Sequence, residues 1–187
     1  CMNERVKTIL RFWFIESTSK DHFSKDDNFD KKIKEDFEDD YIKAINNELD
    51  DWQDNPESCL ALVILLDQFS RNLFRNSPEA FKYDYKTRLI VNEAIDRGDL
   101  EEIDINKKFF LILPLIHSED ISDHIFAKKL CHTYLKNHIQ FKEIQKQFEY
   151  HTIAIKKFGR YPHRNKLLGR ESSPEEQKFL SELNSAW

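Results

Sequence analysis

The sequence predicts an all-α protein in which about eight antiparallel helices form a bundle, or a short solenoid of helical hairpins, around a buried central helix at about 57–74. Leu60 to Leu66 are apolar without a break, and a helix that is apolar on all sides is buried on all sides. A strand is the competing interpretation. However, Pro56 and Glu57 suit a helical first turn, and the apolar spacing continues to Phe74. The chain also has only three glycines and five prolines, which is typical of long helices with short connections.

Length and composition fit one domain spanning residues 1–187. The chain is 40% apolar and 13% aromatic, so it can bury a substantial core. No apolar run approaches the roughly 20 residues that cross a bilayer, and no signal peptide is evident. We therefore expect a soluble, cytoplasmic protein without a membrane partner. The cysteines Cys1, Cys59 and Cys131 are isolated, which predicts reduced thiols.

Charge is unevenly distributed along the chain. Residues 20–54 contain 13 acidic and 6 basic residues, a net charge of −7, whereas residues 105–170 contain 5 acidic and 13 basic residues, a net charge of +8. All histidines except His22 lie in this basic half. A solvated acidic helix face explains the first half. The basic half could complement that face or bind an anionic ligand. Because its basic residues are scattered and the whole chain is acidic, we expect no nucleic-acid partner.

Apolar periodicity defines the first elements. A helix is predicted from about Asn3 to Phe14, followed by a polar connection from Glu16 to Asp27. Between Phe29 and Leu49 an apolar residue recurs every four positions, which predicts a surface helix closed by Trp52. Asn55 precedes a proline and should interrupt helix before the central element begins.

Caps and breakers divide the second half. Ser77 and Pro78 should begin a helix that runs to about Arg97 and ends at Gly98. Asp84 and Arg88 form an i, i+4 acid-base pair on this helix. A short helix from Lys107 to about Ile116 should be interrupted by Pro114.

The chain then continues with three more predicted helices. Ser118 should cap the first, with two acidic residues in its opening turn. The second runs from about Asn137 to Phe158, ends at Gly159, and directs His151 toward the core. After a polar loop, the last helix starts at Ser173 and reaches about Leu183.

Four motifs together make the chain resemble a known bacterial family. They are FWF at 12–14, LLDQFSRNLFR at 65–75, LPLIHSED at 113–120 and FGRYPHRNKLLGR at 158–170. The chain is similar to the domain of unknown function 924 family from residue 9 to about 180. The resemblance implies a tetratricopeptide-like α-α superhelix or bundle, and no activity. The sequence departs from the usual family pattern at Ser70, where proline is common, at Asn76, where glycine is common, and at His124, where glutamine is usual.

The end of the central helix carries a first polar group. Asp67 and Arg71 are four residues apart on a face that neighbouring helices should cover, which favours pairing over solvation. With Asn72 and Arg75 they form either a ligand cradle or a structural salt bridge.

Histidines supply a second set of candidates. His117 could be a base or ligand beside Glu119 and Asp120, although a helix cap with dipole-matched acids explains the two acidic residues. His151 lies on an apolar stripe, where a hydrogen-bonded core histidine is more common than a catalyst.

The loop after Gly159 is dense in polar groups. Arg160, His163, Arg164 and Asn165 fall within six residues, and Arg170 follows. A loop held by its own hydrogen bonds could need them, but paired arginines also suit carboxylates and phosphates.

Cofactor and metal signatures are weak or missing. His117, Asp120 and His124 would share one helical face only if the helix were unbroken from 117 to 124, and no zinc-binding spacing is present. The three glycines form no phosphate-binding or dinucleotide-binding fingerprint. We therefore expect no metal and no cofactor.

Two functional classes stay open, and we leave undecided whether the protein is an enzyme. One is a non-enzymatic, tetratricopeptide-like module whose groove binds a peptide or protein and whose polar cluster is structural. The other binds a small anion, a carboxylate or a phosphate, where Asp67 and Arg71 meet at least two of the later histidines, acids and arginines. The excess of arginine and histidine over nearby acids favours the second class. The candidate residues are Asp67, Arg71, Asn72, Arg75, His117, Glu119, Asp120, His151, Arg160, His163, Arg164, Asn165 and Arg170.

Overall fold

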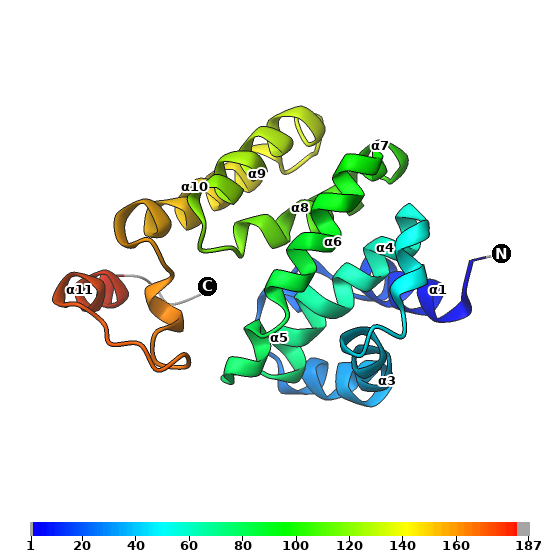
Figure 1. Cartoon of the computed structure of the whole chain (residues 1–187), viewed down its shortest axis with the longest axis horizontal. Coiled ribbons are helices and arrows are strands. Elements are labelled where there is room, and N and C mark those ends of the chain that lie inside the picture. Colours follow the sequence, from blue (N-terminus) through cyan, green and yellow to red (C-terminus); the bar gives the residue numbers. More distant parts are fainter. Residues whose placement is uncertain (1, 183–187) are drawn as a thin grey trace.

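A computed structural model describes residues 2–182, and those residues are helical with no strand, which confirms the all-α prediction. Cys1 and the predicted helix end at Leu183 lie outside the described residues. No helix in the described range is long and apolar enough to cross a membrane. Figure 1 shows the helices packed side by side, with short connections. The α-helices of eight or more residues are α1 (Glu4–Arg11), α3 (Asp27–Ile45), α4 (Pro56–Val63), α6 (Asp84–Arg97), α8 (Ile105–Ile116), α9 (Ile121–Tyr134), α10 (Phe141–Phe158) and α11 (Pro174–Glu182).

The predicted central helix is present and enclosed. It starts as α4, widens into a π-helical segment at Ile64–Phe69, and ends as the short helix α5 (Ser70–Leu73). The Asn55 side chain caps its start by accepting hydrogen bonds from two backbone N–H groups. Every residue from Leu60 to Leu66 is fully buried. Helices α1, α3, α6 and α8 pack around it, so this element is the centre of the hydrophobic core.

The N-terminal elements differ from the prediction in their ends. Helix α1 continues into a second π-helical segment, Phe12–Glu16. The expected connection contains a short helix, α2 (Ser19–Phe23), which a Thr18–Asp21 capping box stabilises. Helix α3 ends at Ile45 rather than Leu49, because Asn47 adopts a left-handed conformation with φ of 63°.

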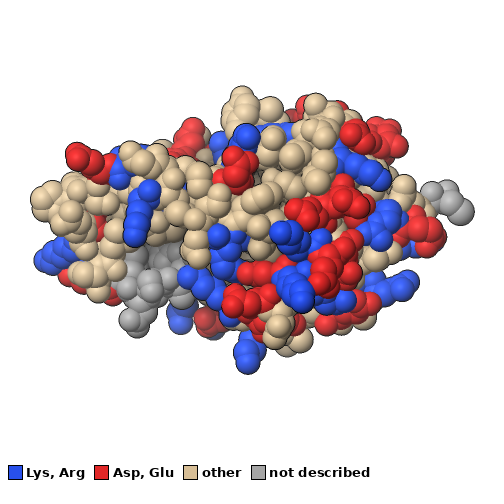
Figure 2. All heavy atoms as spheres, turned by 90° about the horizontal axis from the view of Figure 1, so that it is seen from below, with Lys and Arg blue, Asp and Glu red and all other residues tan. Residues whose placement is uncertain are grey.

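Helix α3 carries the acidic half of the chain on the molecular surface. Figure 2 views this side, where acidic and basic side chains are interspersed. Lys31 pairs with Glu35 and Lys32 with Asp36 at i, i+4 spacing, and all four side chains are exposed. These contacts are those of a solvated helix face.

Three boundaries in the second half correct the predictions. Ser77 caps a 3-10 turn, Pro78–Phe81, and α6 begins only at Asp84 before Gly98, with φ of 90°, ends it. Pro114 does not interrupt α8, which continues past it to Ile116. Asp120, not Ser118, caps α9, since the Asp120 carboxylate accepts from the Ser122 backbone N–H.

Two further turns bear on later sections. Asn76 has a φ of 62°, a conformation that glycine adopts freely and asparagine tolerates, which explains why an asparagine can stand where the resembled family commonly has glycine. The remaining short helix, α7 (Asp99–Glu102), leads from Gly98 toward α8. Cys59 and Cys131 are buried and form no disulfide, and burial raises the pKa of both thiols to about 11.

The C-terminal part forms one end of the molecule (Figure 1). Helix α10 begins at Phe141, four residues later than predicted, because residues 137–140 form a turn. Gly159, with φ of 67°, ends it as expected. The polar loop contains a 3-10 turn, Pro162–Arg164, and leads to α11. A small apolar cluster of Ala154, Ile155, Tyr161 and Phe179 joins α10, this loop and α11.

Candidate functional site

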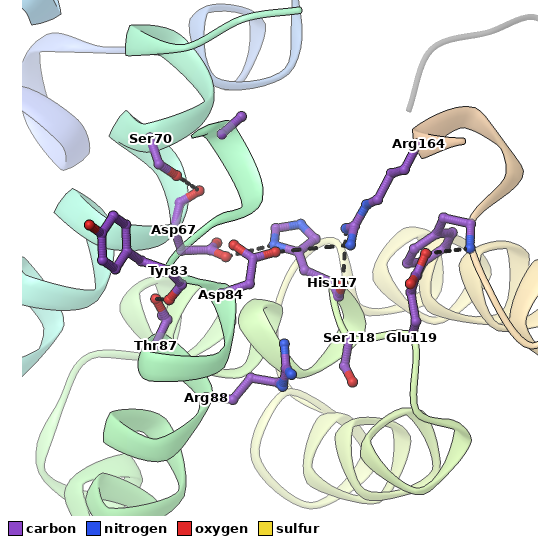
Figure 3. Close-up of polar contacts among 12 residues, drawn as sticks. Asp67, Ser70, Tyr83, Asp84, Thr87, Arg88, His117, Ser118, Glu119 and Arg164 are labelled. Atoms are coloured by element: carbon purple, nitrogen blue, oxygen red, sulfur yellow. Dashed lines mark hydrogen bonds and ion pairs between the residues drawn. The ribbon is translucent and has the colours of Figure 1, made fainter. Parts of the chain in front are cut away.

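Asp67 and His117 form a buried hydrogen-bonded pair. Asp67 lies in the π-helical segment and is 2% exposed, and its Oδ1 is 2.7 Å from Nδ1 of His117, the residue after α8 (Figure 3). The Gln68 side chain donates to Oδ2 at 2.7 Å. Burial by itself would raise the pKa of Asp67, but His117 and Arg71 outweigh it and lower that pKa. The His117 side chain is 20% exposed, and among residues 2–182 its Nε2 has no hydrogen-bond partner.

Arg71 is paired with Asp84 of α6 rather than with Asp67. Its two terminal nitrogens donate to the two Asp84 oxygens at 2.5 and 2.8 Å, and one also donates to the Ala80 carbonyl at 2.8 Å. The predicted i, i+4 pairs Asp67–Arg71 and Asp84–Arg88 are therefore wrong. Asp84, on the neighbouring helix α6, gives Arg71 a planar, two-point contact, which is the stronger form of an arginine–carboxylate pair.

Arg164 enters the same region from the C-terminal loop. The residue is 7% exposed, and its guanidinium carbon lies 4.5 Å from the Phe81 ring centroid and 4.8 Å from that of Tyr161. One terminal nitrogen donates to the His117 carbonyl at 2.9 Å, and the other lies 4.0 Å from Asp84. Within the described chain its buried Nε has no hydrogen-bond partner. Burial lowers the pKa of Arg164 to about 10, so the side chain remains charged at neutral pH.

Arg88 is the third cationic side chain around His117. Its Nε lies 3.6 Å from Oδ2 of Asp123, an oxygen to which the Ser118 hydroxyl donates at 2.6 Å. No hydrogen bond from Arg88 is found in residues 2–182. Figure 3 shows Arg88, His117 and Arg164 reaching from α6, the end of α8 and the C-terminal loop toward one region. We call Asp67, Arg71, Asp84, Arg88, His117 and Arg164 the polar centre.

Three other candidates of the C-terminal loop bind carboxylates that lie outside the polar centre. Arg160 contacts Glu176 at 3.0 and 2.7 Å, and Asn165 donates to the same carboxylate at 3.0 Å. Arg170 holds both oxygens of Glu119, at 2.8 and 2.9 Å. These hydrogen bonds explain why the loop is polar without requiring a ligand.

Four further candidates lie outside the polar centre. Asn72 and Arg75 both bind the Asp30 carboxylate of α3, which fastens the central helix to α3. Asp120 is the helix cap of α9 already described. His151 is half-buried and packs with its ring 6.1 Å from Tyr161, so it lies beside the main core and not in it.

His163 and His151 flank the same tyrosine. The His163 ring lies 5.3 Å from that of Tyr161. Burial lowers the pKa of His163 to about 3 and that of His151 to about 4, so both imidazoles are neutral near pH 7. Neither supplies positive charge to the polar centre.

Sequence reasoning missed two members of the polar centre as site residues. Asp84 and Arg88 were recognisable as charged residues on one helix, but their spacing suggested a mutual pair. Phe81, whose ring lies 5.1 Å from Arg71 and 4.5 Å from Arg164, carried no sequence signal at all.

The polar centre does not coincide with the surface hollows found along α3 and α10. The first has a volume of about 440 Å³ and is lined by charged side chains of α3. The second has a volume of about 500 Å³ and is lined by α10 residues that include Tyr150 and Ile153. In residues 2–182, no three His, Cys, Asp or Glu side chains are arranged to hold a metal ion.

Comparison with known proteins gives two matches. A family model described as a bacterial protein of unknown function (DUF924) matches residues 9–184. A solved structure of a protein of unknown function from Agrobacterium tumefaciens is 35% identical in sequence, with a TM-score of 0.85. That similarity covers 96% of this chain and 98% of the other. No curated protein matches the sequence.

Proposed function

The chain belongs to the DUF924 family of bacterial proteins, and we propose that its polar centre binds a small anion, a carboxylate or a phosphate, between Arg88, His117 and Arg164. The proposal rests on one observation, the burial of the charged Arg164 side chain with incomplete hydrogen bonding. The Arg164 side chain is 7% exposed, yet within residues 2–182 its Nε has no hydrogen-bond partner and its nearest carboxylate is 4.0 Å away. A buried charge without full hydrogen bonding is costly, and an anion would relieve that cost.

The charges of the polar centre favour an added anion. Asp84 is already held by Arg71 through two short hydrogen bonds, so it neutralises Arg164 only at a distance. Arg88 contributes a second guanidinium, and in the described part of the chain its nearest carboxylate, that of Asp123, is 3.6 Å away. Charge-assisted hydrogen bonds from two guanidinium groups are the usual way to hold a carboxylate or phosphate.

His117 can contact the anion through the outer edge of its ring. Asp67 holds Nδ1, and within residues 2–182 the other ring nitrogen, Nε2, has no hydrogen-bond partner. Either imidazole nitrogen can carry an N–H, so Nε2 can face an anion while Nδ1 stays bonded to Asp67.

A second function has its own supporting observation. Four arginines bind carboxylates within the protein: Arg71, Arg75, Arg160 and Arg170. The two surface hollows, along α3 and α10, lie away from the polar centre. These facts support a purely structural cluster in a tetratricopeptide-like helical module that binds a peptide or protein elsewhere. Such a module would show no specific stabilisation by small anions.

Thermal unfolding at constant ionic strength tests the proposal. Phosphate and acetate should each raise the melting temperature of the wild-type protein, as any ligand of the folded state does. Arg164→Ala should abolish that rise, and Arg88→Gln should reduce it while leaving the Arg71–Asp84 contact intact. Because phosphate also stabilises proteins by exclusion from their surface, the quantity to measure is the difference between wild type and variant.

Arg75→Ala is the matched control. Arg75 is a similarly exposed arginine that binds Asp30, away from the polar centre. This variant should lower the ligand-free melting temperature and keep the full response to phosphate. An equal response in wild type, Arg88→Gln and Arg164→Ala would contradict anion binding at the polar centre.

A further inference from the structure

His117 has the surroundings of a nucleophilic imidazole. The buried Asp67 carboxylate lies 2.7 Å from Nδ1, and Gln68 donates to the other Asp67 oxygen, which fixes the orientation of the ring. Despite its burial, Asp67 has a lowered pKa because of His117 and Arg71, so this carboxylate can only accept a hydrogen bond near pH 7. Nδ1 must therefore carry the N–H, and in the neutral imidazole Nε2 then carries a lone pair. Within residues 2–182, no hydrogen bond uses that lone pair.

Two guanidinium groups can hold a phosphoryl group beside this ring. Arg164 donates to the backbone carbonyl of His117 at 2.9 Å, and in the described part of the chain its buried Nε has no hydrogen-bond partner. Arg88 reaches toward the same region from α6 (Figure 3). The transition state of phosphoryl transfer spreads negative charge over the peripheral oxygens of phosphorus, and positioned cations stabilise that charge.

The acids of the polar centre, Asp67 and Asp84, are both held as hydrogen-bond acceptors. Asp84 accepts two hydrogen bonds from Arg71, and Asp67 accepts from His117. Neither is placed to give a proton to a leaving group. An alkyl phosphate releases an alkoxide, which needs such a proton, whereas an acyl phosphate releases a carboxylate, which does not.

From this arrangement we infer that His117 is a nucleophile that accepts a phosphoryl group and that the substrate of the site is an acyl phosphate. The inference rests on the proposed anion site and specifies its substrate class. The Nε2 lone pair forms a bond to phosphorus while the bond from phosphorus to the acyl oxygen breaks, and the carboxylate leaves with that electron pair. The ring gains one positive charge, which Asp67 balances across the 2.7 Å contact with Nδ1. Attack of water on phosphorus then releases phosphate and a proton and returns the neutral ring.

Acetyl phosphate is the probe that tests the inference, and methyl phosphate is the matched compound whose leaving group needs a proton. The whole chain is mixed with each compound, quenched in base at early times because phosphohistidine is stable there, and digested for peptide mass spectrometry. Acetyl phosphate should place one phosphoryl group on His117, and methyl phosphate should place none. In Arg164→Ala the rate of labelling should fall by about 100-fold, the usual loss when one donor to transition-state charge is removed.

Two histidine variants complete the experiment. His117→Asn keeps a side-chain N–H for Asp67 in the place of Nδ1 and removes Nε2, so it should fold and take up no phosphoryl group. His132→Gln is the matched control, because His132 is an exposed histidine near the end of α9 whose ring lies 6.3 Å from that of Phe141. It should be labelled on His117 as the wild type is. Peptide mapping of the wild type decides the site even if a variant fails to fold.

The outcomes separate this inference from the anion site itself. If phosphate stabilises the wild type through Arg164 but acetyl phosphate leaves no phosphoryl group on His117, the nucleophile is refuted and the anion site stands. If methyl phosphate labels His117 as fast as acetyl phosphate does, or if His132 is labelled as fast as His117, the inference is overturned. If phosphate does not stabilise the protein and acetyl phosphate does not label it, the anion site itself fails.

Discussion

The central helix and the C-terminal segment, residues 159–182, are stabilised by opposite kinds of contact. Leu60 to Leu66 are fully buried among apolar side chains of four helices. The C-terminal segment has only a small apolar cluster and is held by ion pairs, including Arg160 with Glu176 and Arg170 with Glu119. Apolar burial is non-directional and roughly proportional to area, whereas each ion pair depends on the position of one particular partner. The first region should therefore respond to lost volume and the second to lost charge.

The largest expected effect is that of Leu65→Ala in the central helix. The side chain is fully buried, so the substitution should lower the free energy of unfolding by about 2–5 kcal/mol through lost burial and a cavity. Urea denaturation followed by circular dichroism measures it. Leu89→Ala, at a leucine that is 48% exposed, is the matched control and should change little. Equal denaturation midpoints for the two variants would contradict the prediction that the central helix is sensitive to lost buried volume.

A smaller loss of stability is expected at the junction of the two regions, where Asp84 binds Arg71 and lies near Arg164. Asp84→Asn should lower the free energy of unfolding by about 1–3 kcal/mol, because Arg71 keeps its charge in a poorly hydrated position without its carboxylate. The same denaturation experiment applies. Asp36→Asn removes a carboxylate from an exposed pair with Lys32 and should be nearly neutral. If Asp84→Asn lowers the free energy of unfolding no more than Asp36→Asn does, then burial does not strengthen the contact between Arg71 and Asp84.

The smallest expected effect is a local, pH-dependent loosening of the C-terminal segment. Arg160, the Ser173 N–H and Asn165 lower the pKa of Glu176 to about 2, from an ordinary value of 4.5. A carboxyl whose pKa is lowered by folding stabilises the protein when the pH is above the pKa of that carboxyl in the unfolded chain. This stabilisation is lost as pH falls from about 4.5 toward 2. Glu176→Gln should therefore speed amide hydrogen exchange in residues 160–182 at pH 7, relative to the wild type.

The pH series gives this last prediction its control. The difference in exchange between Glu176→Gln and wild type should shrink as pH falls below about 4, once intrinsic exchange rates are corrected. Amides of α8 should exchange alike in both proteins at every pH. A difference that is independent of pH would show that the amide substitution acts by shape and not by charge.

The fold was largely predictable because apolar patterns and caps are local signals. The run from Leu60 to Leu66 predicted an enclosed helix, and Gly98 and Gly159 marked the ends of α6 and α10, where the structure shows left-handed conformations. The π-helical segments were not predictable, since an extra residue in one turn leaves no mark in residue type. The misplaced start of α9 has a similar cause. Ser118 and Asp120 are both good caps, and only the path of the chain decides between them.

The polar centre was predictable in its members more than in its contacts. Asp67, Arg71, His117 and Arg164 were all candidates, because charged residues in covered segments need partners, and the structure brings them together. The choice of partner was not predictable. Arg71 takes Asp84, 13 residues away, and Arg75 takes Asp30 across a helix interface. Such choices depend on how separate helices pack, which spacing along one helix does not encode.

The π-helical segment Ile64–Phe69 determines the directions in which the later side chains of the central helix point. One additional residue in a turn rotates the later side chains by about 100° relative to an uninterrupted α-helix. Leu60 to Val63 precede the segment and would face the same neighbours without it. Arg71 and Asn72 follow it on α5, so their alignment with Asp84 and Asp30 depends on that single extra residue. The segment thus lets one continuous helix bury Leu60 to Val63 before it and direct Arg71 and Asn72 at the carboxylates of Asp84 and Asp30 after it.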